Sequence, residues 1–366
     1  MTYSIKNIAG VYTARPKSGF WGTNNPLFGS EWKTTCIFKS FTLDDLWTFT
    51  FGCHLGHALE FLSALLCHSL FFSDPAWLTT SSTLTLDWIL PIVGFHLLAG
   101  FVFCSFWHYM TYISSHSSRI HHAKFNPDNQ YEPKTGKVGF LTSSTGHLER
   151  EIFYTSLGWL QAAGWQILLM FFWANNNGKG NVVYYTEWRS SPVHFFVVLG
   201  AVTFWREVHF YWCHRGIHPW WDRRGGLLNG DVGAFLYRHC HSLHHKSYNP
   251  GPWAGLSMHP VEHFLYYSCA WLPPLLMKTH PMHFLYASFH ASIAPIGDHD
   301  GHGEPGGNGD FHWLHHAKFE CNYGVPWPID FDKIFGTWVD YKDYKANGNK
   351  MPRNLEKQIS GRTKDD

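Results

Sequence analysis

The sequence predicts an all-α integral membrane protein with about four transmembrane helices and a re-entrant helical hairpin. Three observations support this fold class. Charged residues make up only 15% of the 366 residues, against roughly 25% in soluble domains. Four long apolar blocks lie before residue 213, and Lys and Arg are concentrated in the segments on one side of these blocks. The mean hydropathy of -0.20 is low for such a protein because loops rich in His, Asn and Gly dilute the apolar blocks.

Each predicted transmembrane helix corresponds to one apolar block. The blocks span residues 46–72, 84–113, 152–173 and 193–212. Each approaches or exceeds the ~20 residues that a helix needs to cross the hydrocarbon core. Histidines interrupt them, and ionisable groups at such depth are expected to face the interior of the bundle. Two shorter blocks, 261–277 and 282–296, are separated by a polar turn with Lys278 and predict a hairpin that does not cross fully.

The distribution of basic residues predicts the orientation. If the four blocks cross the membrane, one side receives 24 of the 28 Lys and Arg residues. These lie in residues 1–43, 114–151, 213–260 and the segment from 297 onward. Basic residues stay on the cytoplasmic side of a membrane, so these segments are expected in the cytosol. The formal net charge of +1 gives no electrostatic reason to expect a nucleic-acid partner.

Three histidine clusters lie in the segments assigned to the cytosol. His214 and His218 form an H-x-x-x-H, and positions i and i+4 share a helix face, so both rings can reach one metal ion. Residues 241–245 and 312–316 each form an H-x-x-H-H. In that pattern the histidines at i and i+3 are expected to share one metal ion, while the adjacent histidine points elsewhere and can bind a second.

The eight imidazoles of these clusters exceed what one ion can bind, since zinc takes four ligands. The sequence therefore predicts two metal ions. Imidazole suits iron, zinc and copper, so ligand type alone does not select the metal. Iron is preferred because the clusters adjoin apolar helices, where reductive activation of O2 next to a lipid would oxidise an unactivated C–H bond.

Further motifs surround the clusters and carry a family resemblance. They are Y-W-x-H-R-x-x-H at 211–218, H-x-x-H-H-K at 241–246, M-H-P-x-E at 258–262, H-D-G at 299–301, N-Y-G at 322–324 and D-x-x-F-G-T at 332–337. With these motifs the chain resembles the fatty acid hydroxylase and sterol desaturase superfamily of membrane-bound di-iron oxidases, most of all its sterol desaturase branch. The resemblance covers about residues 190–340.

This resemblance implies a cytosolic histidine-rich cap that holds the dimetal site above the transmembrane helices. It also implies two iron ions, O2 as co-substrate, and electrons from NAD(P)H delivered by a cytochrome b5-type donor and its reductase. The metal ligands carried over from the motifs are His214, His218, His241, His244, His245, His299, His312, His315 and His316. The dimetal centre itself is expected to be the catalytic group.

Seven other residues are weaker candidates, as ligands or as groups that orient ligands. His302 and His259 are near the motifs, and His259 is as often a residue that shapes the site. Glu262 and Glu207 can accept the second N–H of a ligand, although an ion pair with a neighbouring Arg is an equal alternative for Glu207. The remaining candidates are Asp298 and Asp310, which each lie near a ligand in sequence, and His239, for which a supporting or surface role is favoured.

The predicted organisation has four parts. Residues 1–43 form an N-terminal cytosolic segment, 44–190 the first transmembrane helices with a cytosolic loop, 191–340 the catalytic domain, and 341–366 a polar tail. The predicted location is the endoplasmic reticulum membrane in a eukaryote or the inner membrane in a bacterium, with the metal site facing the cytosol.

The predicted function is hydroxylation or desaturation of a membrane lipid, with a sterol favoured, in lipid or sterol biosynthesis. One alternative is a monooxygenase for fatty-acyl or alkylglycerol-type lipids. An alternative from another class is a histidine-rich membrane metal transporter, which would need ligands within the spans at the midplane. A zinc hydrolase would need only three protein ligands, which fits nine candidate histidines poorly.

Overall fold

A computed structural model describes most of the helical part of the chain. The described residues are 55–113, 125, 147–176, 184–219, 231–247, 250–301, 309–325 and 330–351. They are mostly helical and contain no strand, only an isolated bridge between Tyr184 and Thr279. The predicted segment 1–43, His302 and the last residues of the polar tail lie outside the described residues.

The described part of the chain forms a series of helices. They are α3 (Leu55–Phe71), α4 (Trp77–Thr80), α5 (Leu86–His108) with the π-helix η2 (Tyr109–Ile113), α7 (His147–Asn176), the 3-10 helix η4 (Trp188–Ser190), α8 (Pro192–Gly216), α9 (Val232–His239), the 3-10 helix η5 (His241–Lys246), α10 (Pro260–Tyr266), α11 (Ser268–Leu276), α12 (Pro281–Asp298), α13 (Gly309–Lys318), α14 (Phe331–Phe335) and α15 (Tyr341–Ala346).

The four predicted transmembrane blocks correspond to α3, α5, α7 and α8. Two helices are long and apolar enough to cross a membrane, Leu86–Ile113 and Leu148–Asn176. The apolar part of α3 is shorter, Ala58–Phe71. The 25-residue α8 does not meet the same test; it carries Arg206 and Glu207 in addition to several histidines. In the residues that the structure describes, the all-α fold is confirmed, and two helices qualify as candidate membrane spans by length and composition.

The centre of the bundle is α12. Nearly all of its residues are buried, which is the pattern of a helix covered on every side. Helices α3, α8 and α11 pack along it, and α5 contacts both α12 and α7. The predicted hairpin of residues 261–296 thus comprises α10, α11 and α12. Its second arm is the core of the bundle rather than a peripheral element.

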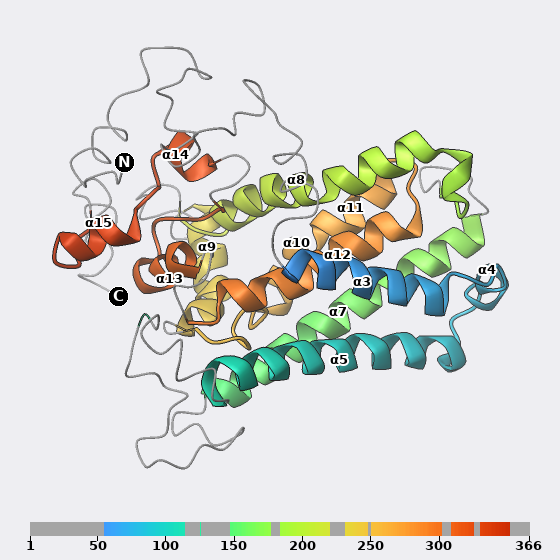
Figure 1. The fold of residues 1–366 in the computed structure, drawn as a ribbon, viewed down its shortest axis with the longest axis horizontal. Coiled ribbons are helices and arrows are strands. Elements are labelled where there is room, and N and C mark those ends of the chain that lie inside the picture. Colours follow the sequence, from blue (N-terminus) through green and yellow to red (C-terminus); the bar gives the residue numbers. More distant parts are fainter. Residues whose placement is uncertain are drawn as a thin grey trace.

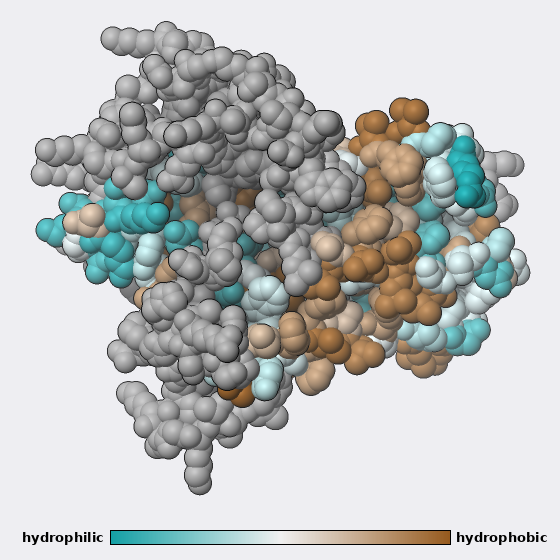
Figure 2. All heavy atoms as spheres, in the orientation of Figure 1, coloured by the Kyte–Doolittle hydropathy of each residue, from teal (hydrophilic) through white to brown (hydrophobic). Residues whose placement is uncertain are grey.

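The outside of the bundle is apolar. Large side chains are exposed along α3 (Leu62, Leu66), α5 (Leu98, Phe101) and α8 (Phe196). Figure 2 shows hydrophobic residues gathered over the middle of the bundle, with hydrophilic residues at both of its ends. Exposed apolar patches of this extent mark a surface that contacts something other than water.

The small helices gather at one end of the bundle. Figure 1 shows α9, α13, α14 and α15 at the end where α8 and α12 terminate. Contacts of α9 with α8 and η5, and of α13 with α12 and α15, hold this end together. The three histidine clusters lie at the end of α8, on η5 and on α13, so the fold brings them to one place.

Candidate metal centre

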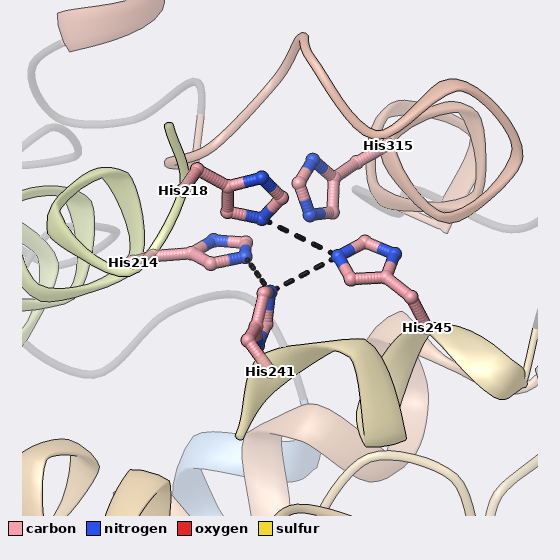
Figure 3. A group of neighbouring side chains, drawn as sticks. All are labelled: His214, His218, His241, His245 and His315. Carbon is pink, nitrogen blue, oxygen red and sulfur yellow. Dashed lines mark hydrogen bonds between the residues drawn. The ribbon is translucent and has the colours of Figure 1, made fainter. Parts of the chain in front are cut away.

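All nine histidines predicted as ligands are buried and fall into two groups. The five-histidine group contains His214, His218, His241, His245 and His315. The four-histidine group contains His244, His299, His312 and His316. Within each group the candidate ligand nitrogens lie within 4.8 Å of one another. Figure 3 shows the rings of the five-histidine group pointing toward one another from α8 and the segment just after it, from η5 and from α13.

The pairing of histidines within each H-x-x-H-H differs from the sequence prediction. His241 and His245 share one group while His244 belongs to the other. In the third cluster His312 and His316 pair, and His315 joins the five-histidine group. The prediction that the histidines at i and i+3 share one metal ion was therefore wrong. The histidines at i and i+4 lie in the same group. The reason in α13 is helical geometry, because at 100° per residue the i+4 position is offset by about 40° and the i+3 position by about 60°.

Backbone carbonyls fix the tautomer of three of these rings. His214 Nδ1 donates to the carbonyl of Tyr323 at 2.6 Å, and His315 Nδ1 donates to the carbonyl of Cys321 at 2.6 Å. His299 Nδ1 donates to the carbonyl of Pro295 at 2.7 Å. A carbonyl only accepts, so Nδ1 carries the proton in each neutral ring and Nε2 presents a lone pair toward its group.

The carboxylate of Glu262 fixes the tautomer of a fourth ring, His241. Its Oε1 lies 2.6 Å from His241 Nδ1, and both side chains are buried. His241 Nε2 then faces His214 Nε2 at 3.1 Å with a lone pair on each nitrogen. Two lone pairs at this separation repel, whereas a cation between them binds both. His315 Nε2 is likewise buried without a hydrogen-bond partner. These atoms are arranged as metal ligands.

The distances between nitrogens also fit metal coordination. Neighbouring Nε2 atoms are 3.0–3.3 Å apart in the five-histidine group. In the four-histidine group they are 2.9–3.3 Å apart. Ligands at about 2.1 Å from one ion are separated by about 3.0 Å at an angle of 90° and by about 3.4 Å at the tetrahedral angle. Each group therefore has the spacing of ligands around a single ion.

Burial keeps these rings in the form that binds metal. Desolvation, followed by repulsion from neighbouring rings, lowers the pKa of His244, His245 and His316 well below the usual 6.5. Desolvation lowers the pKa of His315 to about 3 and that of His299 to about 4, although hydrogen bonds to backbone carbonyls oppose the shift. The rings are neutral at pH 7, and neutral imidazole is the ligand form.

A tight turn at residues 319–324 positions two of the ligands. Phe319 and Asn322 have φ angles of 66° and 55°, a left-handed conformation that is uncommon outside glycine. The turn directs the carbonyls of Cys321 and Tyr323 at His315 and His214. Sequence reasoning recognised N-Y-G as a motif without assigning it this role; an asparagine, which tolerates the left-handed region, was the available signal.

Asp332 holds this turn in place. Its carboxylate accepts hydrogen bonds from Tyr323 N at 2.8 Å, from Gly324 N at 2.7 Å and from the Thr337 hydroxyl at 2.6 Å. The N-Y-G and D-x-x-F-G-T motifs therefore form one hydrogen-bonded unit behind the metal groups. Gly336, at φ 74°, ends α14 in the left-handed conformation that a glycine adopts without strain.

The weaker acidic candidates occupy different places. Glu207 accepts from Arg206 Nη1 at 3.0 Å, so it forms the ion pair that was the alternative to orienting His214. Asp298 precedes His299 and lines a cavity beside the histidines, where burial raises its pKa to about 6. Asp310 is partly buried at the start of α13, and desolvation raises its pKa. Glu320, not considered from the sequence, lies 3.8 Å from His218 Nδ1.

Two of the weaker histidine candidates, His259 and His239, lie apart from both groups. His259 caps α10, and its Nδ1 accepts a hydrogen bond from Val261 N at 3.2 Å. It therefore shapes the chain next to Glu262. His239 is exposed at the end of α9 and contacts the ring of Phe235, which matches the surface role. His302 lies outside the described residues.

A cavity adjoins both metal groups. His214 and His241 of the five-histidine group and His244, His299 and His312 of the four-histidine group line it. Its other walls are mainly apolar. They include Phe210, Ile217, Met258, Leu265 and Val325. Because histidines of both groups line the cavity, a ligand in it would be in contact with both metal groups.

Comparison with known proteins identifies the region that carries the site. The Fatty acid hydroxylase family model matches residues 198–337. A Delta(7)-sterol 5(6)-desaturase of Gibberella zeae is 27% identical over 40% of this chain and 41% of its own length. A lathosterol oxidase of Rattus norvegicus is 25% identical over 55% of this chain and 64% of its own length. A sphinganine C4-monooxygenase of Arabidopsis thaliana is 26% identical over 42% and 58%. No solved structure matches the chain.

The matched regions cover about two fifths to two thirds of the length of these relatives. The matched residues 198–337 contain all nine grouped histidines, Glu262 and the cavity beside them. The resemblance predicted from the motifs is thus confirmed: residues 198–337 match the Fatty acid hydroxylase family model, and the similar proteins include sterol desaturases.

Proposed function

We propose that this protein is an O2-dependent di-iron oxidoreductase that hydroxylates or desaturates a membrane lipid, with a sterol as the preferred substrate. The observation that carries this proposal is the pair of buried histidine groups that share one largely apolar cavity. The relatives named as sterol desaturase, lathosterol oxidase and sphinganine monooxygenase all modify lipids by oxidation. When bound, two iron ions would supply the reduction of O2 and the oxidation of a C–H bond.

The residues of the chain divide the remaining tasks. The five-histidine group would hold one ion and the four-histidine group the other. The carbonyls of Tyr323, Cys321 and Pro295 and the carboxylate of Glu262 keep the ligating nitrogens unprotonated. The apolar walls of the cavity exclude water and hold the lipid against both ions. Electrons come from NAD(P)H through a cytochrome b5-type donor and its reductase.

The proposed setting is a multi-pass membrane protein. In it α3, α5, α7 and α8 cross the bilayer, and the end of the bundle that carries the histidines faces the cytosol. The exposed apolar side chains around the bundle support a lipid contact. Residues 1–43 and 341–366 would be cytosolic, 44–190 would carry the first transmembrane helices, and 191–340 would be the catalytic domain. The histidine groups lie at one end of the bundle, which disfavours a metal transporter with midplane ligands.

The test combines metal analysis with product formation. Purified protein is expected to contain two iron ions, and His241→Ala and His315→Ala are each expected to abolish lipid oxidation while the protein still inserts into membranes. His239→Ala, which removes an exposed histidine outside both groups, is the matched control and should retain activity. Lipid analysis of a strain that lacks the protein would identify the accumulated substrate. Full turnover in either ligand variant, assayed with reductant and O2, would refute the proposal.

A further inference from the structure

The cavity beside the histidines has a polar section in its wall. Besides the histidines, Glu262 and Cys213, the ionisable side chains Arg206, Asp298 and Tyr266 line it. They come from the end of α12 and from α8 and α10, which pack together. An oxidation site for a hydrocarbon chain does not need these groups, so their presence indicates a further role for this wall.

Arg206 and Tyr266 already have partners. Arg206 Nη1 donates to Glu207 Oε1 at 3.0 Å, and Arg206 Nη2 donates to the Tyr266 hydroxyl at 2.8 Å. Tyr266 in turn donates to the carbonyl of Ala291 at 2.7 Å. The guanidinium also lies over the ring of Phe210, 4.7 Å from its centroid. These contacts fix the guanidinium, and Glu207 balances its charge.

Unlike Arg206 and Tyr266, Asp298 has no side-chain hydrogen-bond partner among the described residues, although it lines the cavity together with Arg206. A carboxyl group removed from water without a hydrogen-bond partner is strongly unfavourable. An alkyl chain in the cavity would leave it in that state. A ligand that fills the cavity must therefore bring its own hydrogen-bonding group to Asp298.

The charges nearby limit what that group can be. Glu207 neutralises Arg206, so no unpaired positive charge is present for a phosphate or carboxylate headgroup among the cavity residues that the structure describes. The nearby pairs Arg206–Glu207 and Glu60–His290 each balance in charge, so charge does not select between a neutral and a cationic donor. The sterol favoured in the proposed function carries a hydroxyl group and no amine, which points to a neutral donor. Among lipids the neutral donor is a hydroxyl group, as in a sterol, a long-chain alcohol or an acylated sphingoid base.

We propose that Asp298 is a specificity-determining residue that accepts a hydrogen bond from a neutral hydroxyl group of the lipid substrate. This inference rests on the proposed function and adds a recognition element to it. Since Asp298 directly precedes His299 on the chain, a hydroxyl group bound there anchors the lipid next to the four-histidine group. The site then selects substrates by the distance between their hydroxyl group and the carbon that is oxidised.

The experiment measures binding without turnover. The iron-loaded protein in lipid nanodiscs, kept free of O2, is titrated with a sterol, a long-chain alcohol and an N-acyl sphingoid base. Each is compared with its methyl ether, and a long-chain amine serves as the cationic probe. Wild-type protein should bind at least one hydroxyl lipid roughly 10- to 100-fold more tightly than its ether, the range expected for a hydrogen bond to a charged group. The lipid that shows the largest ratio identifies the source of the hydroxyl group.

Asp298→Leu should remove this preference. Binding of the hydroxyl lipid should weaken roughly 10- to 100-fold, and binding of the ether should stay within about 2-fold, with the iron content unchanged. Asp87→Leu, which replaces an exposed aspartate at the start of α5, is the matched control and should preserve the wild-type ratio. If Asp298→Leu loses iron, Asp298→Asn replaces it; the amide still accepts a hydrogen bond, so only part of the preference should disappear.

Three results would overturn the inference. They are equal binding of alcohol and ether by wild-type protein, equal weakening of both in the Asp298 variant, and tighter binding of the amine than of every hydroxyl lipid. The proposed function is judged separately by admitting O2 and reductant to the same samples. If no lipid is oxidised, the proposed function fails whatever the binding data show. If lipids are oxidised without any preference for a hydroxyl group, only the role of Asp298 fails.

Discussion

Replacing Glu262 tests whether groups behind the histidines set the affinity for metal. Glu262 Oε1 lies 2.6 Å from His241 Nδ1, with 5% of the glutamate side chain and 1% of the histidine side chain exposed. The carboxylate fixes the tautomer of His241 and increases the basicity of Nε2. Loss of such a partner weakens metal binding by about 10- to 100-fold, which corresponds to about 1.4 to 2.7 kcal/mol.

Two substitutions of Glu262 should weaken metal binding to different extents. Glu262→Gln keeps an oxygen that can accept from His241 but loses the charge, so the weakening should be near 10-fold. Glu262→Ala removes the acceptor and should approach 100-fold. The assay is competition for iron(II) between the protein and a chelator of known affinity, with metal content read directly. Glu149→Gln, at an exposed position near the start of α7, is the matched control. Metal affinities indistinguishable from wild type in both Glu262 variants would refute the argument.

Three further predictions follow from the packing around the site. Asp332→Asn should lower the free energy of unfolding by about 1–3 kcal/mol and weaken metal binding, because the carboxylate holds the turn that orients His214; denaturant melts and iron titration check this, and an unchanged melt contradicts it. Gly233→Ala should cost at least about 1–3 kcal/mol, since its Cβ would lie 2.0 Å from the His218 carbonyl. Gly164→Ala, with nothing within 4 Å of the added Cβ, should be neutral or mildly stabilising in the same melt, and equal melting of the two alanine variants would show that α9 can shift freely. Metal-free protein should lose stability as the pH falls below about 6.5. The histidines of the unfolded chain then bind protons, whereas the buried rings of the folded protein do not accept them until about pH 4 or lower. Melting temperatures at pH 7.5 and 5.5 measure this loss, and an equal or higher melting temperature at pH 5.5 contradicts it.

Much of the architecture is encoded locally. The apolar blocks marked α3, α5, α7 and α8 because a helix that contacts lipid or a helical core needs a long apolar stretch, which composition reveals directly. The histidine spacings identified all nine members of the two groups, since imidazoles that recur at helical intervals on one face are the usual pattern of metal ligands. The hairpin was found as two apolar segments, but its burial at the centre of the bundle depends on contacts with α3 and α8, which no local pattern contains.

The tertiary structure decided how the ligands are shared and what holds them. Whether His244 joins His241 or His299 depends on where α12 and α13 lie relative to η5, and that relation is set by packing over long sequence separations. The carbonyls of Tyr323, Cys321 and Pro295 are invisible to residue-type reasoning because every residue has one; only the path of the backbone makes these three orient rings. The same holds for Asp298, which is one acid among many in the sequence and becomes distinctive when folding leaves it without a hydrogen-bond partner among the described residues, in the wall of the cavity. The sequence thus determined the identity of the chemical groups, because side-chain type and spacing are local properties. The fold determined their partners, because hydrogen bonds between distant segments exist only once those segments meet.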